Sequence, residues 1–557
     1  MTTEIPMLNV QIDGVWLQFP KGTRVIEACR QAGKFVPHYC YHPKLSSPGN
    51  CRMCMVEMGM PKMGPDRKPV TGADGRPEIN WIPRPQISCA QDVSEGMAIR
   101  TESPMVTECR NGVMEFLLIN HPLDCPICDQ AGECRLQEFS VEFGKGGSRF
   151  LEEKVKKPKN VELGPRITLD DERCILCSRC IRFMREVAHD DVLGFVERGS
   201  YSTLTCHPDR TLDSNYSLNT VDICPVGALT SSDFRFQMRV WFLKETKSIC
   251  TACGTGCNTV IGSREDRVHR QTPRENDAVN ACWMCDHGRL DFRRFEAEHR
   301  LLAPTVAGGA APETATWETA IESAAAKLRA LRAAGRRIAL LGSGRLTNEE
   351  LFLAGRLAAT LEAVTDIVPR PQEADGILVC EDGNPNSRGA ALLGFAASPA
   401  GSRLEAIRAG IRSGEIGGLL ALSEDPTACG LTEQDLAKLD LFVAVDALPN
   451  PATKHAHIVL PGAAPAEKRG SMINLKGRLQ RLNRAVQPPG SARDDWEILR
   501  DLDTALTGIA GPATIEEVFR AMSASAPTLA GLTLSRIGDQ GISIEPTPAS
   551  TPAPATA

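Results

Sequence analysis

Alternating apolar and polar residues at the start of the chain predict a β-hairpin followed by a helix. The runs LNVQI and VWLQF alternate in this way and flank Asp13-Gly14, a pair typical of two-residue hairpin turns. Thr23 then stands where a helix N-cap is expected, and RVIEACRQAG, closed by Gly33, follows as the helix. Residues 59–86 are rich in Gly, Pro and Lys and are expected to form an inserted surface loop.

The pattern changes along the chain. Residues 105–145 are expected to be mainly helical, with an interruption at His121-Pro122, and residues 303–313, rich in Pro, Gly and Ala, to form a linker or domain boundary. Beyond it, short apolar runs alternate with helical patterns such as TNEELFLAGRLAATLEAV, which predicts an α/β domain with a largely parallel sheet. The expected strands are 337–342, 376–380, 418–422, 441–446 and 457–462. The tail from residue 545 is expected to be disordered.

Composition limits the classes of function. The 557 residues are enough for several domains, and 42% hydrophobic with 24% charged residues is typical of a soluble globular protein. A net charge of −6 without a basic block gives no support to nucleic-acid binding. The start MTTEIPMLNV does not have the pattern of a secretory signal, and no apolar run approaches the roughly 20 residues that span a bilayer. Membrane association is therefore expected only through partner subunits.

Cysteine is the most informative residue type. Nineteen of the 21 cysteines precede residue 290. Fifteen of them, with one histidine, fall into four sets with metal-ligand spacing, which we number in chain order: Cys40, Cys51, Cys54 and Cys89; His121, Cys125, Cys128 and Cys134; Cys174, Cys177, Cys180 and Cys224; and Cys250, Cys253, Cys257 and Cys285. A long chain with thiols concentrated in C-x2-C runs is expected to be a cytosolic metal protein, not a disulfide framework.

Each of the first two sets admits two metals. Set one has a first gap of ten residues in place of the four of plant-type ferredoxins, but its C-x2-C core and distant fourth cysteine favour a [2Fe–2S] centre. Set two is the most diagnostic, because His121 stands four residues before Cys125 and three cysteines alone would leave one iron of a cubane unligated. A neutral imidazole in place of a thiolate removes a negative charge and should raise a cluster's reduction potential. Zinc, which accepts four thiolates or three thiolates with one imidazole, remains the alternative for either set alone.

The last two sets each leave a choice of fourth ligand. Set three has the C-x2-C-x2-C run of bacterial ferredoxins, and Cys224, followed by Pro225, is preferred to Cys206, which predicts one [4Fe–4S] centre. In set four, Cys285 is preferred to Cys282. The cysteines outside the sets are expected to be buried small hydrophobes: Cys29, Cys109, Cys206, Cys282, Cys380 and Cys429.

These sets, in this order, resemble the large iron–sulfur subunit of respiratory complex I, the NADH–quinone oxidoreductase, over roughly residues 8–295. The resemblance implies one [2Fe–2S] cluster on set one and three [4Fe–4S] clusters on sets two, three and four, with the fourth lying off the main electron path. The implied fold is multidomain α+β and α/β. Its expected parts are a 2Fe–2S ferredoxin-like β-grasp domain (1–100), a helical 4Fe–4S domain with one histidine and three cysteine ligands (101–145), a 4Fe–4S ferredoxin-like domain (146–242), a molybdopterin-oxidoreductase-type 4Fe–4S domain (243–300), a truncated, degenerate molybdopterin-oxidoreductase-like α/β domain (301–544) and the disordered tail (545–557).

The resemblance also implies a relay role. No catalytic residue is expected on this chain. FMN and NAD are not expected, because Gly342-Ser343-Gly344 lacks the third glycine of a dinucleotide fingerprint. Molybdopterin is not expected either, because relatives that bind it are usually considerably longer. The implied partners are the NADH/FMN-binding subunit, the smaller [2Fe–2S] subunit and the quinone-proximal subunits, on the cytoplasmic side of a bacterial inner membrane. The alternatives are a molybdenum-dependent formate dehydrogenase-like catalytic subunit, a hydrogenase diaphorase subunit and a zinc-stabilised scaffold.

Overall fold

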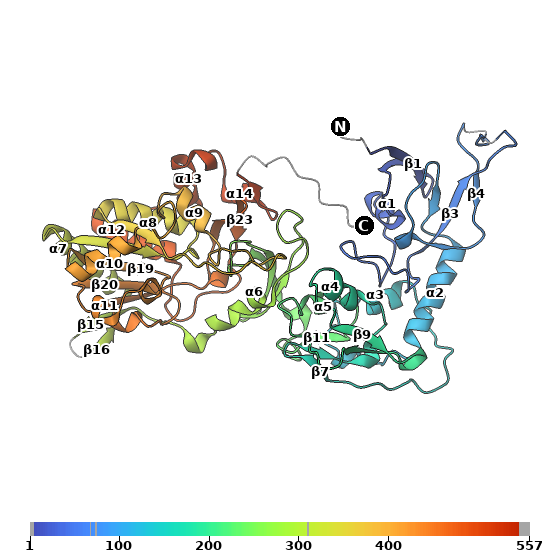
Figure 1. The fold of residues 1–557 in the computed structure, drawn as a ribbon, viewed down its shortest axis with the longest axis horizontal. Helices are drawn as coiled ribbons and strands as arrows, with labels where there is room; N and C mark the ends of the chain where they lie inside the picture. Colours follow the sequence, from blue (N-terminus) through green and yellow to red (C-terminus); the bar gives the residue numbers. More distant parts are fainter. Residues whose placement is uncertain (1–4, 67, 73–74, 309–310, 545–557) are drawn as a thin grey trace. The chain divides into compact units, whose positions relative to one another are not determined.

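The chain divides into two compact units in the computed structural model (Figure 1). The first unit is Met1–Trp241 and the second is Phe242–Ala557. The structure describes residues 5–66, 68–72, 75–308 and 311–544, so the tail expected to be disordered lies outside the described residues. Within these ranges, no helix combines the length and apolar character needed to cross a membrane.

The first unit opens with the predicted hairpin and a mixed sheet. The sheet order is β2-β1-β6-β3-β4, with β5 paired to β3. Ile12 pairs with Val15 around the turn, and β1 runs parallel to β6. The elements are β1 (Met7–Ile12), β2 (Val15–Pro20), α1 (Val25–Gln31), β3 (Met55–Pro61), β4 (Ile79–Trp81), β5 (Gln86–Ile87) and β6 (Ala98–Arg100).

Two expectations for this sheet are wrong. Thr23 does not cap α1, because its hydroxyl donates to the carbonyl of Pro20 at 2.7 Å and Arg24 occupies the N-cap. Residues 59–86 are not a plain loop, since β3 extends to Pro61 and pairs antiparallel with β4. Gly59 permits this pairing, because an added Cβ there would lie 2.4 Å from the side chain of Ile79. Gly33 does close α1, with a φ of +74°.

The rest of the first unit consists of helices and short strands around cysteine-bearing loops. As predicted, two helices flank the His121-Pro122 interruption. β8 lies between β7 and β11 in one small sheet, and β9 pairs with β10 in another. The elements are α2 (Pro104–Leu118), α3 (Arg135–Glu142), β7 (Val161–Gly164), β8 (Ile167–Leu169), α4 (Arg179–Glu186), β9 (Leu193–Val196), β10 (Thr203–Cys206), α5 (Asn219–Asp222) and β11 (Leu229–Ser231).

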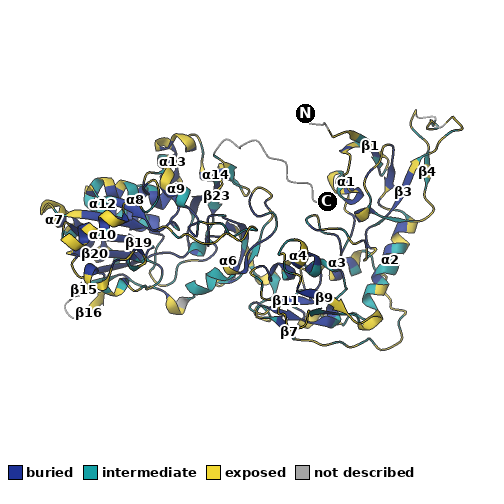
Figure 2. Cartoon of the chain, in the orientation of Figure 1, coloured by how far each residue is buried: buried dark blue, intermediate teal, exposed yellow. Residues whose placement is uncertain are grey.

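The second unit begins with an antiparallel sheet and continues into an α/β domain. Its first elements are β12 (Lys244–Ile249), β13 (Asn258–Arg264), β14 (Arg267–Pro273) and α6 (Asp286–Leu290). The large sheet has the order β16-β15-β21-β20-β19-β17-β18, and β21, β20, β19, β17 and β18 are parallel. The parallel sheet is therefore confirmed, and Figure 2 shows its central strands as buried.

The remaining elements of the second unit are the strands of this sheet and the helices and strands around it. They are β15 (Thr305–Gly308), β16 (Ala311–Thr314), α7 (Trp317–Ala333), β17 (Arg337–Gly342), α8 (Asn348–Leu361), β18 (Val364–Ile367), α9 (Ser387–Leu392), α10 (Leu404–Ser413), β19 (Ile416–Leu422), α11 (Glu433–Leu436), β20 (Leu441–Asp446), β21 (Ile458–Pro461), β22 (Gly470–Ile473), β23 (Arg478–Leu482), α12 (Asp495–Thr507), α13 (Ile515–Ser525), α14 (Leu534–Ile537) and β24 (Ile542–Ser543).

Two segments differ from expectation here. Residues 303–313 are not simply a linker, because β15 and β16 pair with each other and β15 pairs with β21. The run 376–380 is bent, not a strand. Asp375 Oδ1 accepts hydrogen bonds from the amides of Ile377, Leu378 and Val379, which a strand would have offered to its neighbour.

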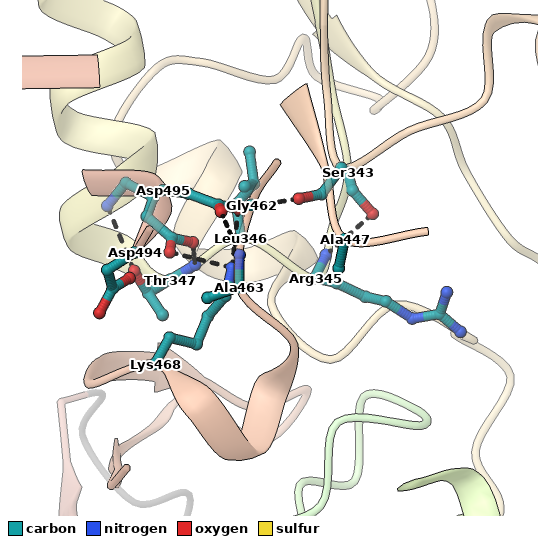
Figure 3. A network of polar contacts seen from close by, with 12 residues as sticks. Ser343, Arg345, Leu346, Thr347, Ala447, Gly462, Ala463, Lys468, Asp494 and Asp495 are labelled. Atoms are coloured by element: carbon teal, nitrogen blue, oxygen red, sulfur yellow. Dashed lines mark hydrogen bonds and ion pairs between the residues drawn. The ribbon is translucent and has the colours of Figure 1, made fainter. Parts of the chain in front are cut away.

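A buried ion-pair network fixes the carboxyl edge of the large sheet (Figure 3). Lys468 Nζ lies 2.8 Å from Asp495 Oδ2 and 3.0 Å from Glu350 Oε1. Asp495 Oδ1 also accepts from the amide of Ala463 at 3.0 Å. Thr347 and Glu350 form a capping box at the start of α8. The strand–helix turn at Gly342-Ser343-Gly344 therefore leads into a helix whose N-terminal groups are satisfied within the protein.

Candidate iron–sulfur sites

We name the sites after their sets. Site one lies in the loop between α1 and β3, with its fourth cysteine in the short turn Ser88–Ala90. The four side chains lie next to one another, with Cys51 beside Cys40, Cys40 beside Cys89 and Cys89 beside Cys54. The Cys40 amide also points at Cys51 Sγ, at 3.5 Å. The structure therefore gathers the whole predicted set in one place.

Site two lies in the turn between α2 and α3. Cys125, Cys128 and Cys134 are close enough for their charges to act on one another. His121 lines the same cavity, of about 700 Å³, as Cys125 and Cys134. Burial, reinforced by the charges of Arg173 and Lys154, lowers the pKa of His121 to about 4. The imidazole is therefore neutral at physiological pH, as a metal-ligating histidine must be.

Site three lies between the loop before α4 and the turn after α5. The charges of Cys174, Cys177 and Cys224 all act on Cys180, so the four side chains are gathered. Burial raises the pKa of the Cys224 thiol, and the amides of Leu229, Val226 and Ala228, which donate to its sulfur, oppose the rise. Cys206, the competitor for the fourth position, lies on β10 with its thiol 3.4 Å from the carbonyl of Leu163.

Site four belongs to the second unit. Cys250 follows β12, Cys253 and Cys257 lie in the loop before β13, and Cys285 is the N-cap of α6. The charges of Cys250 and Cys285 both act on Cys257. An added Cβ at Gly288 would lie 2.9 Å from Cys250 Sγ and 3.2 Å from Cys285 Sγ, so only glycine lets both sulfurs approach here. The Gly288 amide donates to Cys285 Sγ at 3.3 Å.

The donors around these sites suit iron–sulfur clusters. In sites one, three and four, backbone amides donate to cysteine sulfurs, as from Leu176 to Cys174 at 3.4 Å. Such hydrogen bonds stabilise thiolates and raise cluster potentials. Within the described ranges, no group of three or more His, Cys, Asp or Glu side chains has the arrangement of a single-ion metal site. We therefore recognise the four sites by their grouped, mostly buried cysteine sulfurs and, in sites one, three and four, by the backbone amides that donate to these sulfurs.

Sites one and three are joined by α4. Arg182 donates from Nη2 to the carbonyls of Cys40 and Cys177, at 2.5 and 3.5 Å, and from Nη1 to the carbonyl of Ser46. Arg179 donates to the carbonyls of Tyr41 and Ile223. Two guanidinium groups thus lie between the two sets of sulfurs.

Site two adjoins both of the other sites in the first unit. Cys134 Sγ lies 3.9 Å from the carbonyl of Pro225, and its charge reaches Cys224. Tyr39, fully buried beside Cys40, packs on Phe139 with ring centroids 5.3 Å apart. The charges of both Cys134 and Cys51 act on Tyr39. The first unit therefore brings three predicted sites together around one aromatic and cationic centre.

The remaining cysteines only partly match expectation. Cys29 and Cys429 are buried, as predicted, but Cys109, Cys206, Cys282 and Cys380 are half-buried. The thiol of Cys380 forms a hydrogen bond with Cys253 of site four, a contact that no spacing or local pattern in the sequence indicates.

This fold and these sites define an iron–sulfur protein with ferredoxin-like domains joined to an α/β domain. Family models match in the same order as the predicted domains: 2Fe-2S iron-sulfur cluster binding domain (6–104), NADH-ubiquinone oxidoreductase-G iron-sulfur binding region (110–149), NADH-quinone oxidoreductase subunit 3, ferredoxin-like domain (164–230), NADH-ubiquinone oxidoreductase NDSU1/NuoG-like, 4Fe-4S domain (243–292), and molybdopterin oxidoreductase (383–505). The predicted fold class is confirmed, and both 2Fe–2S and 4Fe–4S binding domains are present.

Curated relatives point to the same kind of protein as the family models. The G subunit of the NADH-quinone oxidoreductase of Rickettsia felis is 40% identical over 355 residues, 64% of this chain and 49% of that protein. NADH-quinone oxidoreductase subunit 3 of Thermus thermophilus is 39% identical over 369 residues, covering 64% and 47% of the two chains. The mitochondrial NADH-ubiquinone oxidoreductase 78 kDa subunit of Neurospora crassa is 38% identical over 348 residues, covering 62% and 44%.

The resemblance to the large iron–sulfur subunits of NADH–quinone oxidoreductase is thus confirmed. The chain spans about half the length of the curated relatives it matches. A chain from a structure of an NAD⁺-reducing [NiFe]-hydrogenase is 27% identical and covers 42% of this chain and 91% of that one, but its TM-score of 0.35 carries no structural argument.

Proposed function

We propose that this chain is an electron-transfer subunit of an NADH–quinone oxidoreductase. It relays electrons from an NADH/FMN-binding subunit towards quinone, in an assembly that also translocates protons. The convergence of sites one, two and three within the first unit carries this proposal. One-electron transfer needs neighbouring cofactors, and here the protein supplies their positions, potentials and insulation.

The cofactors we propose are one [2Fe–2S] cluster at site one and three [4Fe–4S] clusters at sites two, three and four. Bound there, the clusters supply reversible one-electron chemistry. The chain's own residues hold them with thiolates and one imidazole, donate amides to the sulfurs and place Arg179 and Arg182 between sites one and three. The α/β domain, which matches the molybdopterin oxidoreductase model, then serves as a scaffold without that cofactor.

The proposed partners are the NADH/FMN-binding subunit, the smaller [2Fe–2S] subunit and the quinone-proximal subunits. The relatives are named as subunits of such an oxidoreductase, which supports an assembly of this kind. We place the chain on the cytoplasmic side of a bacterial inner membrane, attached through the assembly.

Low-temperature EPR during a redox titration of the anaerobically purified full chain tests this proposal. We expect one binuclear and three tetranuclear signals, and no steady-state NADH oxidation by the isolated chain, because no flavin or nucleotide site is assigned to it. Stoichiometric molybdenum would favour the formate dehydrogenase-like alternative. A colourless chain with bound zinc would overturn the redox proposal.

A further inference from the structure

A fifth cysteine, Cys380, lies beside site four. It belongs to the bent segment before α9, far along the chain from the cysteine loop after β12. Its thiol forms a hydrogen bond with that of Cys253. An added Cβ at the neighbouring Gly254 would lie 3.3 Å from Cys380 Sγ, so the sulfur also contacts the backbone of the ligand loop.

Several contacts hold this thiol in place. The Gly254 amide donates to the carbonyl of Asp382 at 2.8 Å, and the same carbonyl lies 3.3 Å from Cys380 Sγ. Thr255 donates its hydroxyl to the carbonyl of Leu378. The two loops are therefore joined on both sides of Cys380, which holds its backbone next to the ligand loop.

The turn at Asp375 explains how an apolar run delivers a thiol to this place. Asp375 Oδ1 accepts from three successive amides, so Ile377, Leu378 and Val379 curl around its carboxylate. Gln372 Nε2 then donates to the carbonyl of Cys380 at 2.8 Å. Had this run formed the predicted strand, its residues would have paired within a sheet instead of facing the ligand loop.

We propose that Cys380 is a reserve ligand of site four, able to replace Cys253 on the iron that Cys253 holds. This inference rests on the proposed assignment of a [4Fe–4S] cluster to site four. In the exchange, the bond from iron to Cys253 Sγ breaks and a bond from iron to Cys380 Sγ forms. The thiol proton of Cys380, which is directed at the carbonyl of Asp382 in the structure, moves to the released Cys253 thiolate beside it, so charge and electron count are unchanged.

Cys380 contacts one corner of the site directly, through Cys253, although its charge also acts on Cys257. Among the described cysteines, the charge that acts on Cys250 is that of Cys285, another member of the set. Cys253 is the member whose thiol forms a hydrogen bond with an outside sulfur. Removal of Cys253 should therefore be tolerated, whereas removal of Cys250 should not.

The test compares alanine variants of the full chain, purified anaerobically and studied by iron analysis and EPR. Alanine is chosen because serine can itself ligate iron. In Cys253→Ala we expect the site-four signal to persist with altered g values and the iron content to match the parent chain. In the double variant Cys253→Ala/Cys380→Ala we expect that signal to vanish, with a loss of about four irons per chain.

Three controls make the result decisive. Cys380→Ala alone should keep the parent spectrum, Cys250→Ala should lose the site-four signal, and unchanged signals from the other three sites show that each variant has folded. Alkylation followed by peptide mapping gives a second readout. Cys380 should react with N-ethylmaleimide in the parent chain and be protected in Cys253→Ala.

The outcomes distinguish a failure of the reserve-ligand inference from a failure of the proposed [4Fe–4S] assignment at site four. A parent chain without a fourth signal would overturn site four itself, and the reserve ligand with it. A parent chain with the signal, together with a Cys253→Ala variant that lacks it and still exposes Cys380 to alkylation, would overturn the reserve ligand alone. Cys380 would then be only a half-buried thiol that donates a hydrogen bond to the carbonyl of Asp382.

Discussion

On the proposed assignment, His121 would give site two a ligand charge different from that of the other sites. Burial lowers the pKa of its imidazole to about 4, so the ring is neutral at physiological pH. Cys125, Cys128 and Cys134 would bind the proposed cluster as thiolates. In His121→Cys a fourth thiolate replaces the neutral ring and adds a negative charge to the cluster. We expect its reduction potential to fall, because net charge is a principal determinant of cluster potential. An EPR-monitored redox titration measures this change.

The control for this substitution is His299→Cys, which places a new thiol on an exposed histidine of the second unit. It should leave the potential of site two unchanged. His121→Ala, which supplies no ligand atom, should lose the signal. If His121→Ala keeps the parent signal and potential, His121 is not a ligand.

At the residue scale, the sequence predicts ligands where their spacing is local. The sets in C-x2-C runs are brought together by short turns, and Leu176 and Ser178 adopt positive φ angles of 53° and 60° between the ligands of site three. The position of Cys380 could not be predicted, because it depends on Asp375 bending a distant apolar run. Thr23 shows the same limit of prediction from local sequence. Its hydroxyl suits an N-cap, but it donates to the carbonyl of Pro20 instead.

At the scale of elements, α4 links the first and third sites. Arg182 is buried and bonds three carbonyls, and Glu186 at the end of the helix accepts from the Ser46 amide at 2.8 Å. On the proposed assignment, this cation would lie between two anionic clusters and favour their reduced forms. In Arg182→Gln we therefore expect the reduction potentials of sites one and three to fall by about 59 mV each. For a one-electron couple this is about a tenfold change in the oxidised-to-reduced ratio.

Arg185→Gln is the matched control for this prediction. Arg185 lies on the same helix with its side chain 61% exposed and paired with Asp191. Solvent screens its charge, so neither potential should move measurably. Equal shifts in the two variants would show that the effect comes from the helix as a whole and not from the guanidinium between the sites.

Elements whose patterns are continuous were the most predictable. The parallel strands β17, β19, β20 and β21 are buried apolar runs, which is typical of sheets covered on both faces. β4 and the hairpin β15–β16 were missed, because Gly and Pro dominate the segments around them. Their pairing depends on partners elsewhere in the chain, β3 and β21, which no local pattern reveals.

At the scale of the whole molecule, the two units differ in what holds them together. The second unit has two large apolar clusters, which run from Ala320 to Ile537 and from Ala339 to Val459. In the first unit, sites two and three lie among the short elements between α2 and β11, beside buried apolar side chains such as Phe183 and Leu204. On the proposed assignment, cluster ligation would add to the apolar burial that fixes these loops.

Removal of iron should therefore act unequally on the two units. After anaerobic chelation, we expect the first unit to unfold at a lower temperature while the second retains its transition, because its core does not depend on clusters. Differential scanning calorimetry before and after chelation should show one transition shifted and one kept. Limited proteolysis with mass mapping should then find new cleavage within residues 120–230, and in the second unit only near 250–285, around site four. Simultaneous loss of both transitions would contradict this division, since it would mean that the clusters also support the core of the α/β domain.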